Sequence, residues 1–277
     1  MELLTWSDPS YFIFANALIR SIRFHKNNNL IHFNLMDFNE EQFQKVQELF
    51  SKDSKINFIR TNSNQFKYDV KNKTEFYRNY RPRLFLELLK ESKNGKLCTF
   101  GANGIVFTSL EYIENLLEEN DFIFLEREKE NIHTDNPKVV TGINDIQRLV
   151  EDGVDIDKIL STTTGKVVLL GTHAMKNNEA CVGILEKWIN LIENSESINK
   201  TFSDMNFFVK SVVQYQMEKN IKIKTETSAG SDRDTNPFCD TRLNDGTKIW
   251  FAKGPQKFKK KKYLDTVQFF ANYKYEL

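Results

Sequence analysis

An apolar run that enters a turn of small residues and leaves as a second apolar run constrains the fold of this chain most. Residues 96–100 form the first run, residues 101–104 the turn, and residues 105–107 the second run. This pattern is typical of a buried strand whose end opens onto a pocket. Gly101 and Gly104 carry no Cβ, so the backbone there can approach a bound group closely. The stretch therefore predicts a ligand site at the carboxyl end of a strand.

The rest of the chain alternates short apolar segments with longer amphipathic ones. Strands are predicted at residues 3–6, 30–35, 56–59 and 122–125, and helices at residues 12–24, 39–50, 80–89, 112–117 and 178–192. Such an alternation indicates βαβ units. We therefore expect an α/β fold with a mostly parallel central sheet and flanking helices.

The composition narrows the class of protein. With 277 residues, of which 40% are hydrophobic, the chain can bury a sizeable core in one large α/β domain. A net charge of +1 argues against a nucleic-acid-binding protein, because such proteins usually carry a basic surplus. No apolar run has membrane-spanning length, and residues 1–5 lack the pattern of a secretory leader. We therefore expect a cytoplasmic protein without nucleic-acid partners.

The cysteines indicate the same compartment. Cys98, Cys181 and Cys239 are odd in number and scattered, without the spacing of a metal site. We expect buried free thiols, as is usual in a reducing cytoplasm.

The turn and the run after it resemble a known motif. Residues 100–110 are similar to the segment Leu-Asp-Ala-Asp-Val-Leu-Val-x-x-Asp-Leu of nucleotide-sugar glycosyltransferases with the A-type fold. In that family the two aspartates hold a divalent metal against the diphosphate of the sugar nucleotide. Gly101 and Asn103 take their places in this chain. The resemblance implies a Rossmann-like nucleotide-diphospho-sugar transferase fold in which these metal ligands are missing.

The N-terminal segment resembles the opening of the family-8 glycosyltransferases and their relatives. Their first strand leads to an Asp-x-x-Tyr turn that faces the nucleotide base, and Asp8 and Tyr11 match that turn. Residues 21–22 and 31–33 match the helix step and the strand that follow it in the family. The resemblance implies that Asp8 and Tyr11 bind the donor nucleotide. For Asp8 a helix cap is the alternative.

A dense mixture of aromatic and basic residues at 76–83 overlaps the start of the predicted helix that leads to the turn. Guanidinium groups bind phosphate through two parallel hydrogen bonds. The family keeps an arginine or lysine at the start of this helix, and both Arg81 and Arg83 match that position. The choice between them stays open. The alternative is an exposed basic helix start, although a cation there opposes the helix dipole.

Two later segments resemble the part of the family that contacts the transferred sugar. Residues 162–171 are similar to its Asn-x-Gly-Val-Met-Leu strand, with Thr164 in place of the Asn and Gly165 matching the Gly. Residues 203–206 resemble its Asp-Gln-Asp helix start, and Asp204 matches the first Asp. A carboxylate one position into a helix also stabilises the helix dipole, which is the alternative for Asp204.

The segment at 249–257 resembles the family's Ile-x-His-x-x-Gly-Pro-x-Lys motif. Gly254 and Lys257 match, while Phe251 replaces the metal-binding His. With Gly101 and Asn103, three separate ligand positions have lost their chemistry, so we expect no divalent metal. Protein cations must then meet the charge of the diphosphate. The available cations are Lys253, Lys257, Arg81 and Arg83.

A literal Asp-x-Asp motif also occurs at residues 232–234. Polar residues surround it, and no buried strand precedes it. We interpret it as a solvated loop; supply of a carboxylate to the pocket is the alternative.

A basic run lies near the end of the sequence. Residues 252–263 contain six lysines and no acid, and the run from Lys259 to Lys262 is unbroken. Most runs of this kind are solvated surface. With the aromatic residues at 263–270 it is also a candidate for peripheral contact with the inner face of an anionic membrane.

Together these resemblances imply a glycosyltransferase that moves a sugar from a nucleotide-diphosphate donor to a glycan or glycolipid hydroxyl, without a metal or other cofactor. Asp204 and Lys257 are the catalytic candidates. The donor-binding candidates are Asp8, Tyr11, Arg81, Arg83, Gly101, Asn103, Thr164, Gly165, Lys253 and Gly254.

The expected organisation is a single domain at 1–258, with a nucleotide-binding half at 1–110 and an acceptor half at 111–258, followed by a basic and aromatic tail at 259–277. One alternative is a non-catalytic relative that retains nucleotide or glycan binding. Another is a membrane-surface adaptor that uses the lysine run, which leaves the pocket segments unexplained.

Overall fold

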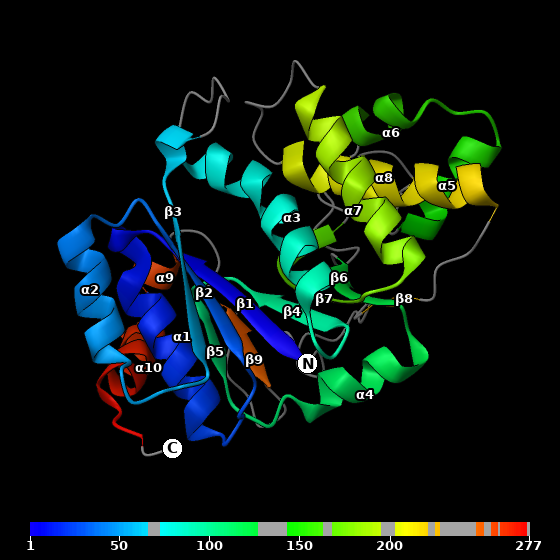
Figure 1. The fold of residues 1–277 in the computed structure, drawn as a ribbon. Helices are drawn as coiled ribbons and strands as arrows, with labels where there is room; N and C mark the ends of the chain where they lie inside the picture. The colour runs from blue at the N-terminus through cyan, green and yellow to red at the C-terminus, as the bar shows by residue number, and fades with distance from the viewer. Residues whose placement is uncertain are drawn as a thin grey trace. The chain divides into compact units, whose positions relative to one another are not determined.

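The computed structural model describes nine stretches of the chain. These are residues 1–65, 73–126, 143–162, 168–194, 203–220, 225–227, 248–251, 256–259 and 261–275. Two compact units contain them (Figure 1). The first unit comprises Met1–Lys67, Leu97–Asn115 and Asp232–Leu277, and the second comprises Tyr68–Lys96 and Leu116–Ser231.

Four parallel strands form the sheet of the first unit. Their order is β3 (Ile56–Thr61), β2 (Ile31–Met36), β1 (Glu2–Ser7) and β4 (Lys96–Phe100). β1 and β2 are buried along almost their whole length, as expected for parallel strands covered on both faces. The chain therefore builds outwards from β1 to β3 and then returns to place β4 on the other side of β1.

Helices connect and cover these strands. After β1 a short 3-10 helix, η1 (Pro9–Tyr11), leads into α1 (Phe12–Phe24), and α2 (Glu40–Leu49) follows β2. Asn39 begins α2 with a capping box that includes Gln42. After α9 (Gln256–Lys259), residues that we predicted as a tail form α10 (Lys261–Asn272), which packs along α1 (Figure 1).

A two-stranded antiparallel sheet also belongs to the first unit. It pairs β5 (Gly104–Val106) with β9 (Ile249–Phe251). The pattern of apolar run, turn and apolar run at 96–107 is therefore confirmed as β4, a turn and β5.

The second unit contains strands of both orientations. β6 (Phe122–Glu126) runs antiparallel to β7 (Val168–Lys176) and parallel to β8 (Thr225–Thr227). Its helices are α3 (Lys73–Glu91), α5 (Ile143–Glu151), α6 (Ile156–Thr162), α7 (Glu179–Glu193) and α8 (Ser203–Lys219); α4 (Glu111–Glu119) spans the boundary between the units.

The core of the second unit follows the periodicity of α7. Leu185, Trp188 and Ile192 are buried, as their helical spacing predicts. The centre of the Trp188 ring lies 5.0 Å from that of Phe208 on α8, in the edge-to-face arrangement that aromatic pairs prefer. Both units together confirm the predicted α/β class, a mostly parallel sheet flanked by helices.

One predicted helix boundary is wrong. We expected a helix to begin at Tyr80, two residues before Pro82, but α3 begins at Lys73 and continues through the proline. Proline weakens a helix because it lacks an N–H and its ring crowds the preceding turn, yet here the surrounding residues keep the helical conformation. Arg81 and Arg83 consequently lie inside a helix, and the expected conflict between a basic helix start and the dipole does not arise.

Two other sequence predictions concern the thiols and the membrane. Cys98 and Cys181 are buried free thiols, as expected, whereas Cys239 lies outside the described residues. Burial raises the pKa of Cys181 to about 12, which keeps the thiol protonated and unreactive. Within the described stretches, none of the helices combines the length and apolarity that crossing a membrane requires.

A buried ion pair ties the end of α1 to the loops around it. The Nε of Arg23 donates to Asp53 at 2.8 Å, and both side chains are 1% exposed. The remaining guanidinium donors bond Asp53 again and the carbonyl oxygens of Asn27, Asn29 and Lys55. Asp53 also accepts from the Tyr275 hydroxyl at 2.8 Å, so the same network holds the segment after α10.

Arg23→Ala should therefore lower the free energy of unfolding by about 3–5 kcal/mol, because it leaves the Asp53 carboxylate buried without its counter-ion. Tyr275→Phe, which removes one bond to the same carboxylate, should cost about 1 kcal/mol. Lys45→Ala breaks the exposed pair with Glu41 and should change stability little. Urea denaturation of the three variants measures this order; equal effects of Arg23→Ala and Lys45→Ala would contradict it.

Candidate functional site

The carboxyl ends of β1 and β4 lie side by side in the first unit. Thr5 pairs with Phe100 across the two strands, and its hydroxyl donates to the Phe100 carbonyl at 3.1 Å. Because β2 and β3 lie on one side of β1 and β4 on the other, the strand order reverses at this point. Open α/β sheets bind ligands at such a reversal. The turns after β1 and β4, which we predicted as donor-binding segments, are therefore neighbours.

Asp8 follows β1 and caps η1. Its Oδ1 accepts from the backbone N–H of Ser10 at 2.7 Å and of Tyr11 at 3.1 Å, and from the Ser10 hydroxyl at 2.5 Å. The capping alternative is thus confirmed. Contact between Asp8 and a nucleotide stays a prediction, and it is compatible with the cap because these three bonds all end on one carboxylate oxygen.

Tyr11 lies at the same turn with a half-buried side chain. Its ring is 5.7 Å from that of Phe14 and 6.2 Å from that of Phe258 on α9. The ring therefore packs on neighbouring aromatic residues, and its predicted role at the base stays untested.

The turn at 101–104 closes on itself at the end of β4. The N–H of Gly104 donates to the carbonyl of Gly101 at 2.9 Å. The carbonyl of Asn103 accepts from the hydroxyl of Tyr263 on α10 at 2.6 Å. Gly101 and Asn103 are both half-buried, so the turn lies at the boundary between core and solvent.

β9 brings the third predicted position to this turn. Phe251 is the Cα partner of Gly104 in the antiparallel pair, and Trp250 is the partner of Ile105. Position 251, distant in the sequence, therefore lies close to positions 101 and 103 in the backbone. Their side chains are a hydrogen, an amide and a phenyl group, of which only the amide has an oxygen that can bind a hard cation. This set does not fit a divalent metal.

The cations expected at the diphosphate are only partly described. The backbone of Lys257 belongs to α9. The ring centre of Phe258, the next residue, lies 5.8 Å from that of Phe14, and this contact holds α9 against α1. Lys253 and Gly254 lie outside the described residues, as do the Asp-x-Asp at 232–234 and Thr164 and Gly165.

A buried aromatic cluster joins the segments of the first unit. Phe14, Trp250 and Tyr263 are each at most 4% exposed, and Tyr11 and Phe107 pack against the same set. We refer to Phe14, Trp250, Tyr263 and the exposed Phe258 as the aromatic cluster. Its members belong to α1, β9, α9 and α10, and Tyr263 also bonds the turn at 101–104.

Sequence reasoning missed Tyr263, which we had placed in a tail. Its spacing from Val267 and Phe270 is that of one face of a helix, and all three side chains are buried. That apolar face was a usable signal, but the preceding lysines drew the interpretation towards a solvated tail.

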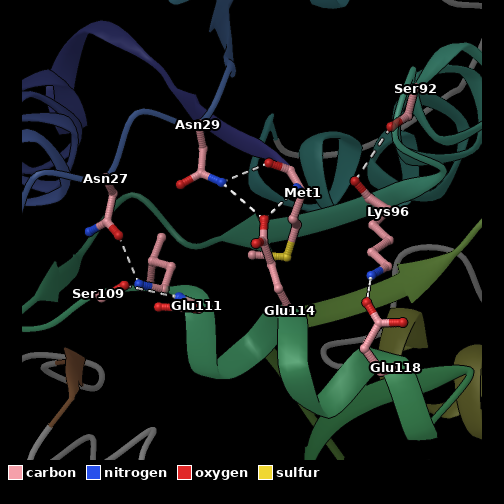
Figure 2. Close-up of polar contacts among 10 residues, drawn as sticks. Met1, Asn27, Asn29, Ser92, Lys96, Ser109, Glu111, Glu114 and Glu118 are labelled. Atoms are coloured by element: carbon pink, nitrogen blue, oxygen red, sulfur yellow. Dashed lines mark hydrogen bonds and ion pairs between the residues drawn. The ribbon is translucent and has the colours of Figure 1, made fainter.

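The segment after β5 is fixed by asparagine side chains and by the start of α4 (Figure 2). The amide of Asn27 donates to the Thr108 carbonyl at 3.1 Å, and its oxygen accepts from the Leu110 N–H at 2.8 Å. The Met1 ammonium pairs with Glu114, and Asn29 donates to the Met1 carbonyl at 2.8 Å. These bonds attach the chain leaving β5 to the loop before β2.

The remaining predicted residues belong to the second unit. Arg83 pairs with Glu193 at the end of α7, so a carboxylate of the same unit partly neutralises its charge. Arg81 is half-buried on the same helix. Asp204 is the second residue of α8, and its side chain is outside the described set. Among the side chains that the structure describes, no three His, Cys, Asp or Glu residues form a group that could hold a metal.

Comparison with solved structures relates this fold to that of glycosyltransferases. The apo structure of the bifunctional glycosyltransferase WbbM matches 100% of this chain and 50% of its own, with a TM-score of 0.56 and 13% identity. The glycosyltransferase GlyE of Streptococcus pneumoniae matches 99% of this chain and 60% of its own, with a TM-score of 0.55 and 12% identity. This chain thus spans about half to three-fifths of the length of these two proteins.

The galactosyltransferase LgtC, in complex with donor and acceptor sugar analogues, matches along nearly its whole length. The alignment covers 100% of this chain and 98% of LgtC, with a TM-score of 0.57 and 12% identity. No protein-family model and no curated protein matches the sequence. At such low identity the likeness concerns the fold, and this chain has the α/β fold of the A-type glycosyltransferases.

Proposed function

We propose that this protein is a glycosyltransferase that moves a sugar from a nucleotide-diphosphate donor to a hydroxyl of a glycan or glycolipid in the cytoplasm. The observation that carries the proposal is the meeting of three segments at one sheet edge. The turns after β1 and β4 follow neighbouring strands, and the Gly104–Phe251 pair adds β9. The resemblance assigned all three segments to donor recognition. Sugar analogues in the LgtC complex add support for donor and acceptor sugars as ligands.

Transfer without a divalent metal is the second part of the proposal. Because Gly101, Asn103 and Phe251 do not form a cation site, protein groups must stabilise the negative charge that develops on the leaving diphosphate. We assign this role to Lys257 and Lys253, with backbone N–H groups of the 101–104 turn. α9, which carries Lys257, is held beside Tyr11 by Phe258.

The other candidates keep the roles that the resemblance implies. Asp8 and Tyr11 would contact the base, Arg81 or Arg83 the phosphates, and Thr164 and Gly165 the sugar. Asp204 would lie near the transferred sugar. Both arginines stay candidates for the phosphates, and Arg83 would have to leave its pair with Glu193.

A non-catalytic protein that binds nucleotide or glycan is the second candidate function. The specific observation in its favour is that positions 101 and 251 lack the side-chain atoms that bind a metal in the family. A protein that only binds its ligand tolerates this loss without a replacement for the metal. Turnover separates the two candidates, since only the first transfers a sugar.

We also propose peripheral contact with an anionic membrane through the lysine run. Lys259, Lys261 and Lys262 are exposed, and Lys261 pairs with Asp265. Phe269 is 57% exposed and Phe24 is 40% exposed, and their rings lie 6.2 Å apart. Exposed aromatic rings beside lysines suit the boundary between lipid headgroups and acyl chains. Tyr263 and Phe270, by contrast, are buried and take no part.

An assay of nucleoside diphosphate release across a panel of nucleotide sugars tests the enzyme. The wild type should turn over at least one donor, with the same rate in the presence of a chelator. Lys257→Ala should slow release about a hundredfold, the scale of losing one preorganised electrostatic group. Lys45→Ala on α2 is the matched control and should keep full activity. Strict dependence on manganese or magnesium would contradict the metal-free site, and nucleotide binding without turnover would favour the second candidate.

Two substitutions of Asp8 separate its cap from its contact with the donor. Asparagine caps helices as well as aspartate, so Asp8→Asn should preserve stability, whereas Asp8→Ala should lose about 1 kcal/mol. If the carboxylate contacts the nucleotide, Asp8→Asn should weaken binding about tenfold, or about 1.4 kcal/mol. Calorimetric titration and thermal denaturation measure the two effects. Wild-type affinity in Asp8→Asn would leave Asp8 as a cap alone.

Vesicle sedimentation tests the membrane contact. The triple variant of Lys259, Lys261 and Lys262 to Gln should lose binding to anionic vesicles, since each lysine near the surface contributes about 1 kcal/mol. Raising the salt should weaken wild-type binding as the charges are screened. A matched triple variant of the exposed Lys45, Lys52 and Lys55 should bind normally. Equal binding by both triple variants would leave the run as ordinary surface.

A further inference from the structure

The peptide group between Asn103 and Gly104 is held at both ends. Its carbonyl oxygen accepts from the Tyr263 hydroxyl at 2.6 Å, and its N–H donates to the Gly101 carbonyl at 2.9 Å. Because a peptide group is planar, two bonds on its opposite sides fix the orientation of the whole plane. The second bond lies within the turn, whereas the first comes from a helix 160 residues further along the chain.

The Tyr263 ring is held in place by the aromatic cluster. It is fully buried, stacks on Phe14 at 6.2 Å and meets Trp250 edge-on at 5.2 Å. Contacts on the face and the edge leave the ring little freedom, so its hydroxyl has a defined direction. Burial raises the pKa of this phenol, with a smaller effect from Tyr11, and the hydroxyl stays a protonated donor at all physiological pH values.

Small residues make up most of the turn. Two of its four residues are glycine and one is alanine, so side chains contribute little packing. β5 begins at Gly104, and its pairing with Phe251 ties down the end of the turn. A turn without the Tyr263 bond would sample other orientations of that peptide, and a ligand would have to select one of them.

We propose that Tyr263 is a positioning residue for the donor diphosphate. By orienting the Asn103–Gly104 peptide, it holds the backbone of the 101–104 turn in the conformation that receives the diphosphate. This inference rests on the proposed function, because it takes the turn as the donor-binding element. Tyr263 acts through the turn and does not itself contact the donor.

Tyr263→Phe removes only the hydroxyl and keeps the ring in the cluster. Tyr275→Phe is the matched control, because it also removes a tyrosine hydroxyl from the C-terminal segment, but one that bonds Asp53 and not the turn. Calorimetry of the full chain with the four common nucleoside diphosphates should show about tenfold weaker binding for Tyr263→Phe and wild-type binding for Tyr275→Phe. The KM for the donor should rise in parallel, with the KM for the acceptor unchanged.

A spectroscopic signature reports the turn directly. The amide nitrogen of Gly104 is bonded to the Asn103 carbonyl carbon, so losing the Tyr263 bond should shift the Gly104 amide resonance in the free protein. Tyr275→Phe should leave that resonance in place. Circular dichroism and thermal denaturation confirm that both variants are folded at the temperature of measurement.

Three outcomes would count against the proposal. Wild-type affinity and an unshifted Gly104 resonance in Tyr263→Phe would overturn it while leaving the proposed function intact. Equal loss of affinity in both variants would also overturn it, because the effect would then come from general loosening of α10. If the wild type binds none of the nucleoside diphosphates, the proposed function fails and the donor role with it. The Gly104 resonance alone would then decide whether Tyr263 orients the turn.

Discussion

Packing of the aromatic cluster is the interaction on which the first unit depends. The parallel strands alone place the ends of β1 and β4 together, but they do not fix the conformation of the turns that follow. Tyr263 restrains the turn after β4 through its bond to Asn103, and its ring stacks on Phe14 of the helix after β1. Fully burying one such ring contributes roughly 1.5–3 kcal/mol, so the cluster stabilises the first unit while Tyr263 also bonds the turn at 101–104.

Locally encoded features were predictable from the sequence. The strands β1, β2 and β3 and the inward face of α7 follow from apolar periodicity, and the Asp8 cap follows from the residue type at a helix start. The start of α3 was not predictable, because Pro82 indicates a helix boundary and yet α3 continues through it. Residue propensities therefore predict the type of a secondary-structure element better than the residue at which it begins.

The arrangement of the candidate site depended on contacts that no local pattern encodes. The pairing of Gly104 with Phe251 and the bond from Tyr263 to Asn103 both join distant segments. For the segments of Gly104 and Phe251, only the family resemblance suggested that they belong together. Nothing in the resemblance pointed to Tyr263. Its hydroxyl reaches Asn103 because the helix that carries it packs on α1.

The separation of 160 residues between Asn103 and Tyr263 also has a consequence for how the protein is made. Contacts between distant residues form late, since the chain must first close the loop between them. The sheet order β3-β2-β1-β4 is complete by Phe100, long before the ribosome adds α10. A nascent chain therefore contains these four strands well before the turn at 101–104 can receive the bond from Tyr263.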